Sequence, residues 1–235
     1  GIAKHAQEVN KLHVITTAVE HKAVLEPAYY LKNIGFDVTV LPVDEKGWPN
    51  PKDLDKAFLA EVLNLPSESL IGDHMSTIDV DAIHNVREFV LKTLAQNNRQ
   101  EFKDIYHALK VAEKGVLSPK AMGDRALKNI CLAYLMQLET AETVDLCYLQ
   151  FHECLTMTDE IAALGLLCSV DVDERQKAID SFCDKWGHDV VVMNKWFSVQ
   201  AASKLANTVQ RVEILSEHAA FDPTNPNKVR SLVGV

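Results

Sequence analysis

The sequence predicts a mainly α-helical protein, a helical superhelix of antiparallel helix pairs preceded by a short β-α-β segment. Two apolar, β-branched runs flank one amphipathic helix within the first 43 residues. From about residue 58 onward, apolar residues recur with the 3.6-residue period of an α-helix. Short connections without a Gly/Ser linker join these helical stretches, which favours helix pairs stacked into a solenoid or curved bundle. We therefore expect two parts, residues 1–57 and residues 58–235.

The β-α-β segment is predicted from three adjacent runs. The run "LHVITTAV" (12–19) is apolar and β-branched, and "FDVTVLPV" (36–43) alternates with the period of two that a strand requires. Between them, one helical face carries the apolar residues Val24, Leu25, Ala28, Leu31 and Ile34. The order strand, helix, strand is that of a right-handed parallel crossover. Two strands alone make a poor sheet, so this segment needs more strands or a covering layer.

Glycine and proline punctuate this segment. Gly35 is placed to end the helix that begins near His21. Pro27 either removes one backbone hydrogen bond inside that helix or marks a later helix start. Residues 44–53, "DEKGWPNPKD", are rich in turn-forming residues and are expected to close the segment.

Amphipathic stripes define the helices of the second part. The clearest stripe has the spacing i, i+3, i+4, i+7, i+8, i+11 and consists of Leu127, Ile130, Cys131, Tyr134, Leu135 and Leu138. Further stripes are Ile83, Val86, Val90, Leu91 and Leu94, then Ala178, Ile179, Phe182, Cys183 and Trp186, then Leu205, Val209, Val212 and Leu215. Thr158 is the expected N-cap of another helix, with Asp159 and Glu160 at the positive end of its dipole. Trp186, Trp196 and Phe197 are expected core aromatics.

Composition excludes several functional classes. The net charge is −9 and the pI is near 5.5, which argues against a protein that binds nucleic acid or an anionic membrane. No apolar run approaches the roughly 18–20 residues of a membrane span, and the N-terminus lacks the apolar core of a signal peptide. The five cysteines are scattered without a C-x-x-C pair, which favours reduced, mostly buried thiols in a cytoplasmic protein.

The first segment resembles a known family. The T-x-x-E-H-x-[AS]-V-L pattern of residues 17–25, followed by a G-F-x-V-T strand, is similar to the early large-domain region of cysteine desulfurases, which use pyridoxal phosphate. The resemblance covers about residues 11–58 and implies that His21 matches the histidine that stacks on the cofactor ring. A desulfurase also needs a Schiff-base lysine and a phosphate cup, and neither Lys11 nor Lys22 has a claim to the lysine role. We therefore expect His21 to be a vestigial cofactor position and the chain to hold no pyridoxal phosphate.

The second part resembles a different family. The segments "LNLPSESLI", "QFHECLTMTDEIAAL", "DKWGHDVVVMNKWFSVQA" and "FDPTNPNKVRSLVGV" are similar, in order, to the C-terminal helical domain of bacterial aminopeptidase N, a zinc metallopeptidase family. The resemblance covers about residues 58–235. It implies a HEAT-like superhelix that closes over a catalytic domain, with Arg230 facing the substrate channel. In the isolated chain, a surface ion pair is the alternative role for Arg230.

A zinc site of the H-E-x-x-H type is absent from the sequence. His152 and Glu153 are followed by Cys154 and Leu155, and Thr156 stands where the second histidine is required. "HECLT" is therefore interpreted as an ordinary helix start. None of His74, His84, His107, His188 and His218 has another histidine or a cysteine four positions away. We expect no catalytic residue and no bound metal in this chain.

These observations lead to one main hypothesis and two alternatives. The chain is expected to be a non-catalytic domain of aminopeptidase N type that, in a complete enzyme, lines the substrate channel and restricts peptide access to a zinc site. It looks chimeric and truncated, with the desulfurase-like fragment fused in front. Its expected partner is a catalytic peptidase domain, or another copy bound through the C-terminal helical end. Alternatively, the chain works with a polypeptide that supplies the missing parts of an aminopeptidase or a desulfurase, or is a structural fragment without activity.

Overall fold

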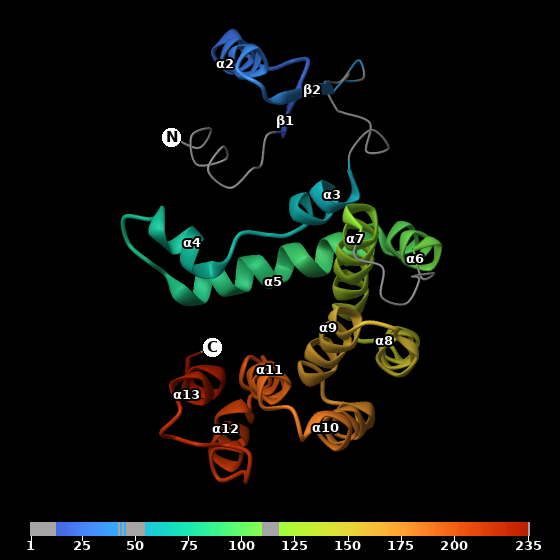
Figure 1. Cartoon of the computed structure of the whole chain (residues 1–235), viewed down its shortest axis with the longest axis vertical. Helices are drawn as coiled ribbons and strands as arrows, with labels where there is room; N and C mark the ends of the chain where they lie inside the picture. The colour runs from blue at the N-terminus through green and yellow to red at the C-terminus, as the bar shows by residue number, and fades with distance from the viewer. Residues whose placement is uncertain (1–12, 42, 44, 46–54, 110–117, 235) are drawn as a thin grey trace. The chain divides into compact units, whose positions relative to one another are not determined.

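The computed structural model of the chain describes residues 13–41, 43, 45, 55–109 and 118–234. The chain divides into two compact units, Gly1–Leu59 and Ala60–Val235. The first contains a short β-α-β segment and the second is helical (Figure 1). The predicted fold class, a mainly α protein with a short β-α-β segment in front, is therefore confirmed. None of the described helices is long and apolar enough to cross a bilayer.

In the first unit, two short parallel strands are joined by one helix. Strand β1 (His13–Thr17) pairs with β2 (Asp37–Leu41), and the register places Thr17 opposite Leu41. Helix α2 (Lys22–Asn33) connects them. Pro27 lies inside α2, so the first of the two sequence alternatives holds, and Gly35 follows the helix with φ +98°, a left-handed conformation that glycine tolerates. Most of the predicted turn at 44–53 lies outside the described residues.

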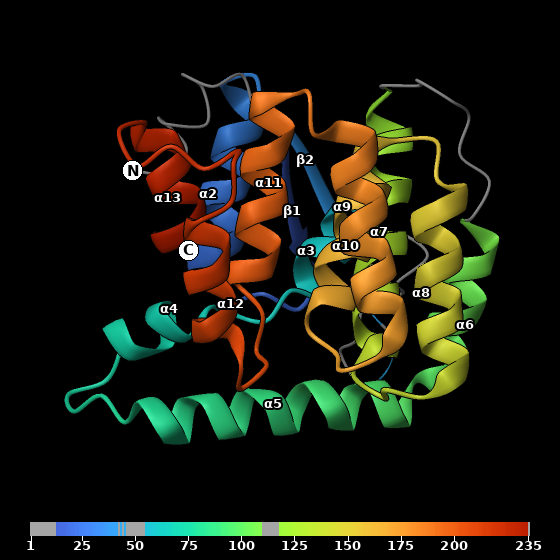
Figure 2. The same ribbon diagram turned by 90° about the horizontal axis from the view of Figure 1, so that it is seen from below.

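The second unit contains most of the helices. In chain order these are α3 (Lys56–Val62), which begins in the first unit, α4 (Glu68–Asp73), α5 (Val80–Asn97), α6 (Arg99–Ala108), α7 (Pro119–Met136), α8 (Ala141–Glu153), α9 (Met157–Cys168), α10 (Asp173–Trp186), α11 (Val190–Ala201), α12 (Thr208–Ser216) and α13 (Pro226–Val233). Figure 2 shows α5 running crosswise to α8, α10 and α11.

The helices stack in a two-layer arrangement. Chain neighbours pack against each other, as α6 does on α7 and α8 on α9. Helices two apart also pack, which gives a continuous row of α7, α9, α11 and α13, with α8 and α10 packed beside it. Repeated contacts between neighbours and next neighbours are the arrangement of a helical superhelix.

The core of this unit follows the row of α7, α9 and α11. Among the fully buried side chains are Leu132, Leu135, Leu164, Leu167, Ile179, Phe182, Met193 and Phe197. The stripe predicted on α7 is largely buried, and its Tyr134 stacks on Phe102 of α6 with ring centroids 4.7 Å apart. The hydroxyl of Tyr134 donates to the Leu63 carbonyl at 2.6 Å. Burying these faces removes apolar surface from water, at roughly 25 cal/mol per Å².

Two predicted core positions are exposed instead. Val86 is 61% exposed, because it lines an open groove of about 340 Å³ between α4 and α5. Val209 is 71% exposed, whereas Leu215 of the same predicted stripe is buried. Helix α12 packs on α11 and α13, and these contacts leave Val209 uncovered among the described residues. Apolar periodicity identified both helices correctly but did not show that these two valines would stay uncovered.

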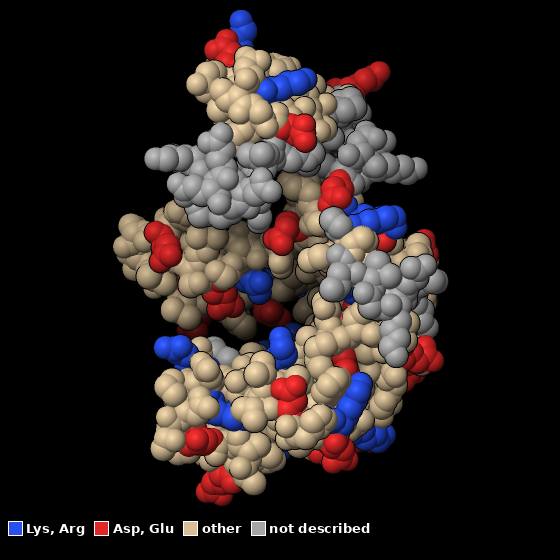
Figure 3. Space-filling model, in the orientation of Figure 1, with Lys and Arg blue, Asp and Glu red and all other residues tan. Residues whose placement is uncertain are grey.

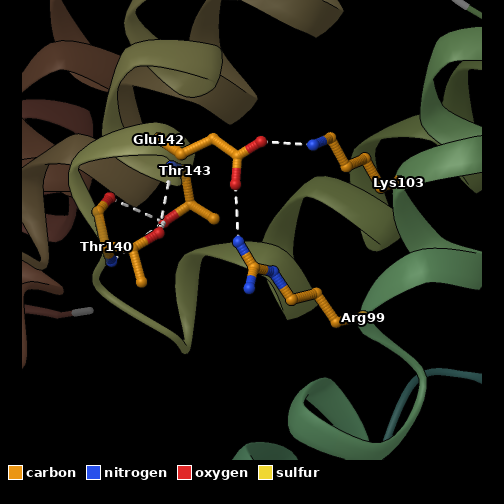
Figure 4. A network of polar contacts seen from close by, with 5 residues as sticks. All are labelled: Arg99, Lys103, Thr140, Glu142 and Thr143. Carbon is orange, nitrogen blue, oxygen red and sulfur yellow. Dashed lines mark hydrogen bonds and ion pairs between the residues drawn. The ribbon is translucent and has the colours of Figure 1, made fainter.

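Two groups of ion pairs join distant parts of the helical unit. Glu142 at the start of α8 accepts from both Arg99 and Lys103 of α6, beside a capping box formed by Thr140 and Thr143 (Figure 4). The Nζ of Lys204, between α11 and α12, lies 3.4 Å from Glu88 Oε2 of α5 and 3.9 Å from Glu139 Oε1. The contact of Lys204 with Glu88 connects residues 116 positions apart, from the loop after α11 to α5.

Candidate functional site

His21 occupies a structural position at the start of α2. Its Nδ1 accepts a hydrogen bond from the Ala23 backbone amide at 3.2 Å, so the residue acts as the N-cap of the helix. The side chain is exposed. With one ring nitrogen committed to capping, the imidazole is held by its own helix. Lys22 is exposed at the first position of α2, and Lys11 lies outside the described residues.

Arg230 is an exposed residue of α13. Its side chain forms no hydrogen bond or ion pair with any residue in the described part of the chain, so its guanidinium donors are available. The helix is anchored at its N-terminus by Asn225, whose side chain accepts from the Asn227 amide at 3.0 Å. This bond forms an Asx-type turn at the start of the helix. Ser198 of α11 donates to the Ser231 carbonyl at 3.0 Å and holds the side of α13 next to Arg230.

Lys228, two residues before Arg230, is buried. Its Nζ lies 5.4 Å from the centroid of the Phe197 ring, a cation–π contact, and among the described residues it forms no hydrogen bond or ion pair. Burial lowers the pKa of Lys228, and the nearby carboxylate of Asp222 acts in the opposite direction. The pKa of Asp222 is itself lowered by hydrogen bonds from the side chain and backbone of Thr224. Helix α13 thus presents one basic side chain outward and buries the other against α11.

A buried polar network lies where α7, α8 and α9 meet. Lys128 Nζ lies 2.7 Å from Asp159 Oδ2, and Asn129 Nδ2 donates to Asp159 Oδ1 at 2.9 Å. Gln150 of α8 donates through Nε2 to Asn129 Oδ1 and to the Asp159 carbonyl. A buried carboxylate is tolerated only when its oxygens are paired, and both oxygens of Asp159 are.

Glu160, the next residue along, anchors a second buried contact. Its Oε1 accepts from Lys185 Nζ at 2.8 Å, and the indole of Trp186 donates to both of its oxygens at 3.3 Å. Glu160 is buried, whereas Lys185 is more than half exposed. The prediction that Asp159 and Glu160 lie in the first turn of a helix is confirmed. Their partners on α7 and α10 were not predicted.

Among the described residues, the cysteines are mostly buried and do not group with the histidines into a metal-binding cluster. Burial raises the pKa of the Cys131 and Cys168 thiols to about 12, and burial together with Glu160 and Asp159 raises the pKa of Cys154 to about 11. All five cysteines are free. Within the described ranges, no group of three or more His, Cys, Asp or Glu side chains is arranged to hold a metal ion.

Residues 152–156, which do not match the zinc motif, do not start a helix as the sequence predicted. His152 and Glu153 end α8 instead of starting a helix, Cys154 is the C-cap, and Thr156 is the N-cap of α9. The Thr156 hydroxyl accepts from the Asp159 amide at 3.3 Å. Thr158 is therefore not the N-cap of α9, because the side chain of Thr156 already accepts from a free backbone amide in the first turn of that helix.

Comparison with known proteins identifies the helical part. The model of the DUF3458_C family, a domain of unknown function with ARM repeats, matches residues 49–235. The chain belongs to this family.

Two matches extend over the DUF3458_C region. The chain is 38% identical over 181 residues to aminopeptidase N of Escherichia coli, a match that covers 77% of this chain and 21% of that protein. A crystal structure of Legionella pneumophila aminopeptidase A in complex with aspartic acid matches with a TM-score of 0.69 and 25% identity, over 91% of this chain and 26% of that one. The chain thus spans about a fifth of the aminopeptidase N that it matches.

A further match extends over a shorter stretch than the DUF3458_C domain. The chain is 49% identical over 51 residues to the cysteine desulfurase IscS of Dictyoglomus turgidum. This covers 22% of the chain and 13% of that protein. Both predicted resemblances, to aminopeptidase N and to cysteine desulfurases, are therefore confirmed.

Sequence reasoning missed the pairing of Lys128 with Asp159 inside the DUF3458_C domain. Lys128 lies within the apolar stripe of α7, three and four positions before the fully buried Cys131 and Leu132. A lysine at that helical spacing belongs to the buried face, where it needs a carboxylate partner. That signal was available in the sequence, although it does not say which carboxylate is the partner.

Proposed function

We propose that this chain is the non-catalytic helical domain of an aminopeptidase N-type enzyme, in which it lines the route to the zinc site and restricts peptide access. The observation that carries the proposal is the 38% identity to aminopeptidase N over 181 residues. The activity itself resides in a catalytic domain that this chain needs as its partner. The chain alone is expected to be inert.

The surface of the helical unit supports a role in guiding peptides. In Figure 3 the surface is hollowed between α5 and the group α11 to α13, and basic and acidic side chains are interspersed around the hollow. A surface that carries both positive and negative side chains can contact peptides of varied sequence. Arg230 is the residue we assign to contact a peptide carboxylate, since its guanidinium is exposed and lacks a partner among the described residues.

Partner, cofactor and location follow from the same proposal. Zinc belongs to the catalytic partner, and we assign neither zinc nor pyridoxal phosphate to this chain. The exposed Val233 of α13, 68% accessible, supports an alternative in which the C-terminal helical end binds a second copy. We assign the protein to the cytoplasm, because its five cysteines are all free.

A reconstitution experiment tests the proposal. The catalytic portion of Escherichia coli aminopeptidase N, without its matching helical segment, is mixed with this chain, and hydrolysis of an alanyl-anilide is compared with hydrolysis of a long peptide. We expect the chain to bind and to lower turnover of the long peptide more than that of the anilide. No binding, or equal inhibition of both substrates, would contradict the proposal.

Variants test the assignment of Arg230. Arg230→Gln should change the Michaelis constant for peptides with a free carboxylate at least severalfold and leave amidated peptides unaffected, since only the former offer a bidentate partner. Lys177→Gln is the control, because it removes an exposed positive charge on α10 that forms only a 3.7 Å pair with Glu174. Equal effects of the two substitutions would assign the change to net charge and not to Arg230.

A further inference from the structure

A cavity of about 490 Å³ lies between α10, α11 and α12. Ile214, 62% exposed, contributes apolar surface to it, and the nearly fully buried Trp196 and Leu215 form the wall behind. Charged side chains of both signs line the same space. A cavity of this size with an apolar wall and a few converging polar groups has the character of a small-molecule site.

The acidic side of the cavity is formed by two helices. Asp180 and Asp184 stand one turn apart on α10, and Glu217 follows the last residue of α12. Asp180 accepts a hydrogen bond from Gln176 Nε2 at 2.6 Å, while Asp184 and Glu217 have no side-chain partner among the described residues. Three carboxylates around one cavity favour a ligand that carries a positive charge.

The basic side of the cavity is Arg211 of α12. Its Nε and Nη2 donate to Gln200 Oε1 at 2.9 and 2.7 Å, and the fully buried Gln200 donates in turn to the Trp196 carbonyl at 2.9 Å. These bonds fix the plane of the guanidinium and leave its other N–H groups free. Burial lowers the pKa of Arg211, and the positive charge of nearby Arg175 adds to this effect.

Arg175 adds a second positive charge near this end of the cavity. The Nε and Nη2 atoms of Arg175 are buried without a hydrogen-bond partner. No ion pair joins Arg211 to Asp180, Asp184 or Glu217 in the described part of the chain. Opposite charges thus face one cavity without a direct ion pair between them among the described residues, so a ligand can interact with both.

We propose that this cavity binds a zwitterionic ligand, an amino acid or a dipeptide with a free amine and a free carboxylate. The carboxylate is bound by Arg211, the ammonium group by Asp184 with Asp180 or Glu217, and an apolar side chain rests on Ile214. A metal ion fits this site less well, because no described group of carboxylates, histidines and cysteines has metal-binding geometry. A purely cationic ligand would meet the guanidinium of Arg211.

Ligand analogues test the proposal on the intact chain. Chemical shifts of the ¹⁵N-labelled protein are followed during titration with leucine, leucyl-leucine, N-acetyl-leucyl-leucine and leucyl-leucine amide. We expect leucyl-leucine or leucine to shift resonances of α10 and α12, and each blocked form to bind at least about tenfold more weakly, because it loses one charged contact. The tighter of the two free ligands identifies the ligand as an amino acid or a peptide. Absence of shifts at millimolar ligand, or equal binding of blocked and free dipeptides, would overturn the proposal.

One substitution and a control locate the site. Asp184→Asn should weaken the free ligand at least severalfold and leave the N-acetylated form unchanged, whereas Asp145→Asn on α8, also exposed, should change neither. Equal loss for free and acetylated ligands would overturn the assignment of Asp184. Arg211 is not substituted, because it also holds the buried Gln200. These measurements need no catalytic partner, so their failure leaves the proposed peptidase role untouched.

Discussion

Lys128 and Asp159 form an ion pair between α7 and α9 that is closed to solvent: their side chains are 5% and 2% exposed, and the bridging atoms lie 2.7 Å apart. The attraction between two such charges offsets the cost of removing them from water only while both are present. The packing of α7 on α9 therefore depends on this ion pair as well as on the apolar core around it.

Removing one member of this pair should destabilise the protein strongly. Lys128→Met leaves Asp159 charged and buried, and we expect the free energy of unfolding to fall by about 3–5 kcal/mol. Urea denaturation followed by circular dichroism measures this. Replacing both residues with apolar ones should recover most of the loss. Lys120→Met, which removes an exposed lysine paired with Asp124 on the same helix, should shift the midpoint far less, and a comparable shift would contradict the assigned cost of burial.

The contacts of Glu142 predict a pH-dependent contribution to stability. Hydrogen bonds from Lys103 and then Arg99 lower its pKa in the folded state. A carboxyl whose folded pKa is lowered stabilises the fold at pH values above its unfolded pKa, and this contribution is lost as the pH falls through the folded pKa. Glu142→Gln should therefore lower the melting temperature at neutral pH and have less effect in acid. Glu213→Gln, at an exposed residue of α12, should show no such dependence on pH.

The thiols should react with iodoacetamide in a definite order. Only the thiolate reacts, and burial raises the pKa of Cys131 and Cys168 to about 12. Burial raises the pKa of Cys183 as well, but this residue is partly exposed, so it should be modified first. Peptide mass spectrometry after timed alkylation at pH 8 gives the order, with urea-unfolded protein as the control in which all five react. Rapid modification of Cys131 in the folded protein would contradict its burial.

Pyridoxal phosphate should not form an imine at one specific lysine of this protein. The N-cap bond of His21 to the Ala23 amide holds the imidazole at its own helix, and Lys22 alone offers no phosphate-binding group. Added cofactor should give no new absorbance band beyond that of free aldehyde with surface lysines, and borohydride should trap no single modified site. Stoichiometric trapping at one lysine would revive a desulfurase-type role for the first unit.

Periodicity predicted the helices well, since a buried face must repeat with the turn of the helix. The stripe from Leu127 to Leu138 was correct because α7 packs along its length in the core. The prediction for Val86 was wrong because the pattern shows only that a helix face is apolar. Burial of that face depends on whether another element packs against it. The groove beside Val86 is a tertiary property that no local rule contains.

Caps and polar partners were harder to predict. Both Thr156 and Thr158 satisfy the residue preference of an N-cap, but an acidic residue three positions later favours Thr156, the cap observed. The ion pair of Lys128 joins residues 31 positions apart, and spacing along one helix cannot reveal it. Arg230 was chosen by resemblance, and the structure adds that it is exposed on a helix anchored to α11.

Lys204 has a mechanical consequence. Its side chain contacts Glu88, 116 positions earlier in the chain, and Glu139, so it links α5 and the turn after α7 to the loop after α11. Because these charged side chains are partly exposed, the contact weakens as dissolved ions screen it. We therefore expect the spacing of the helices that this contact joins to depend on ionic strength.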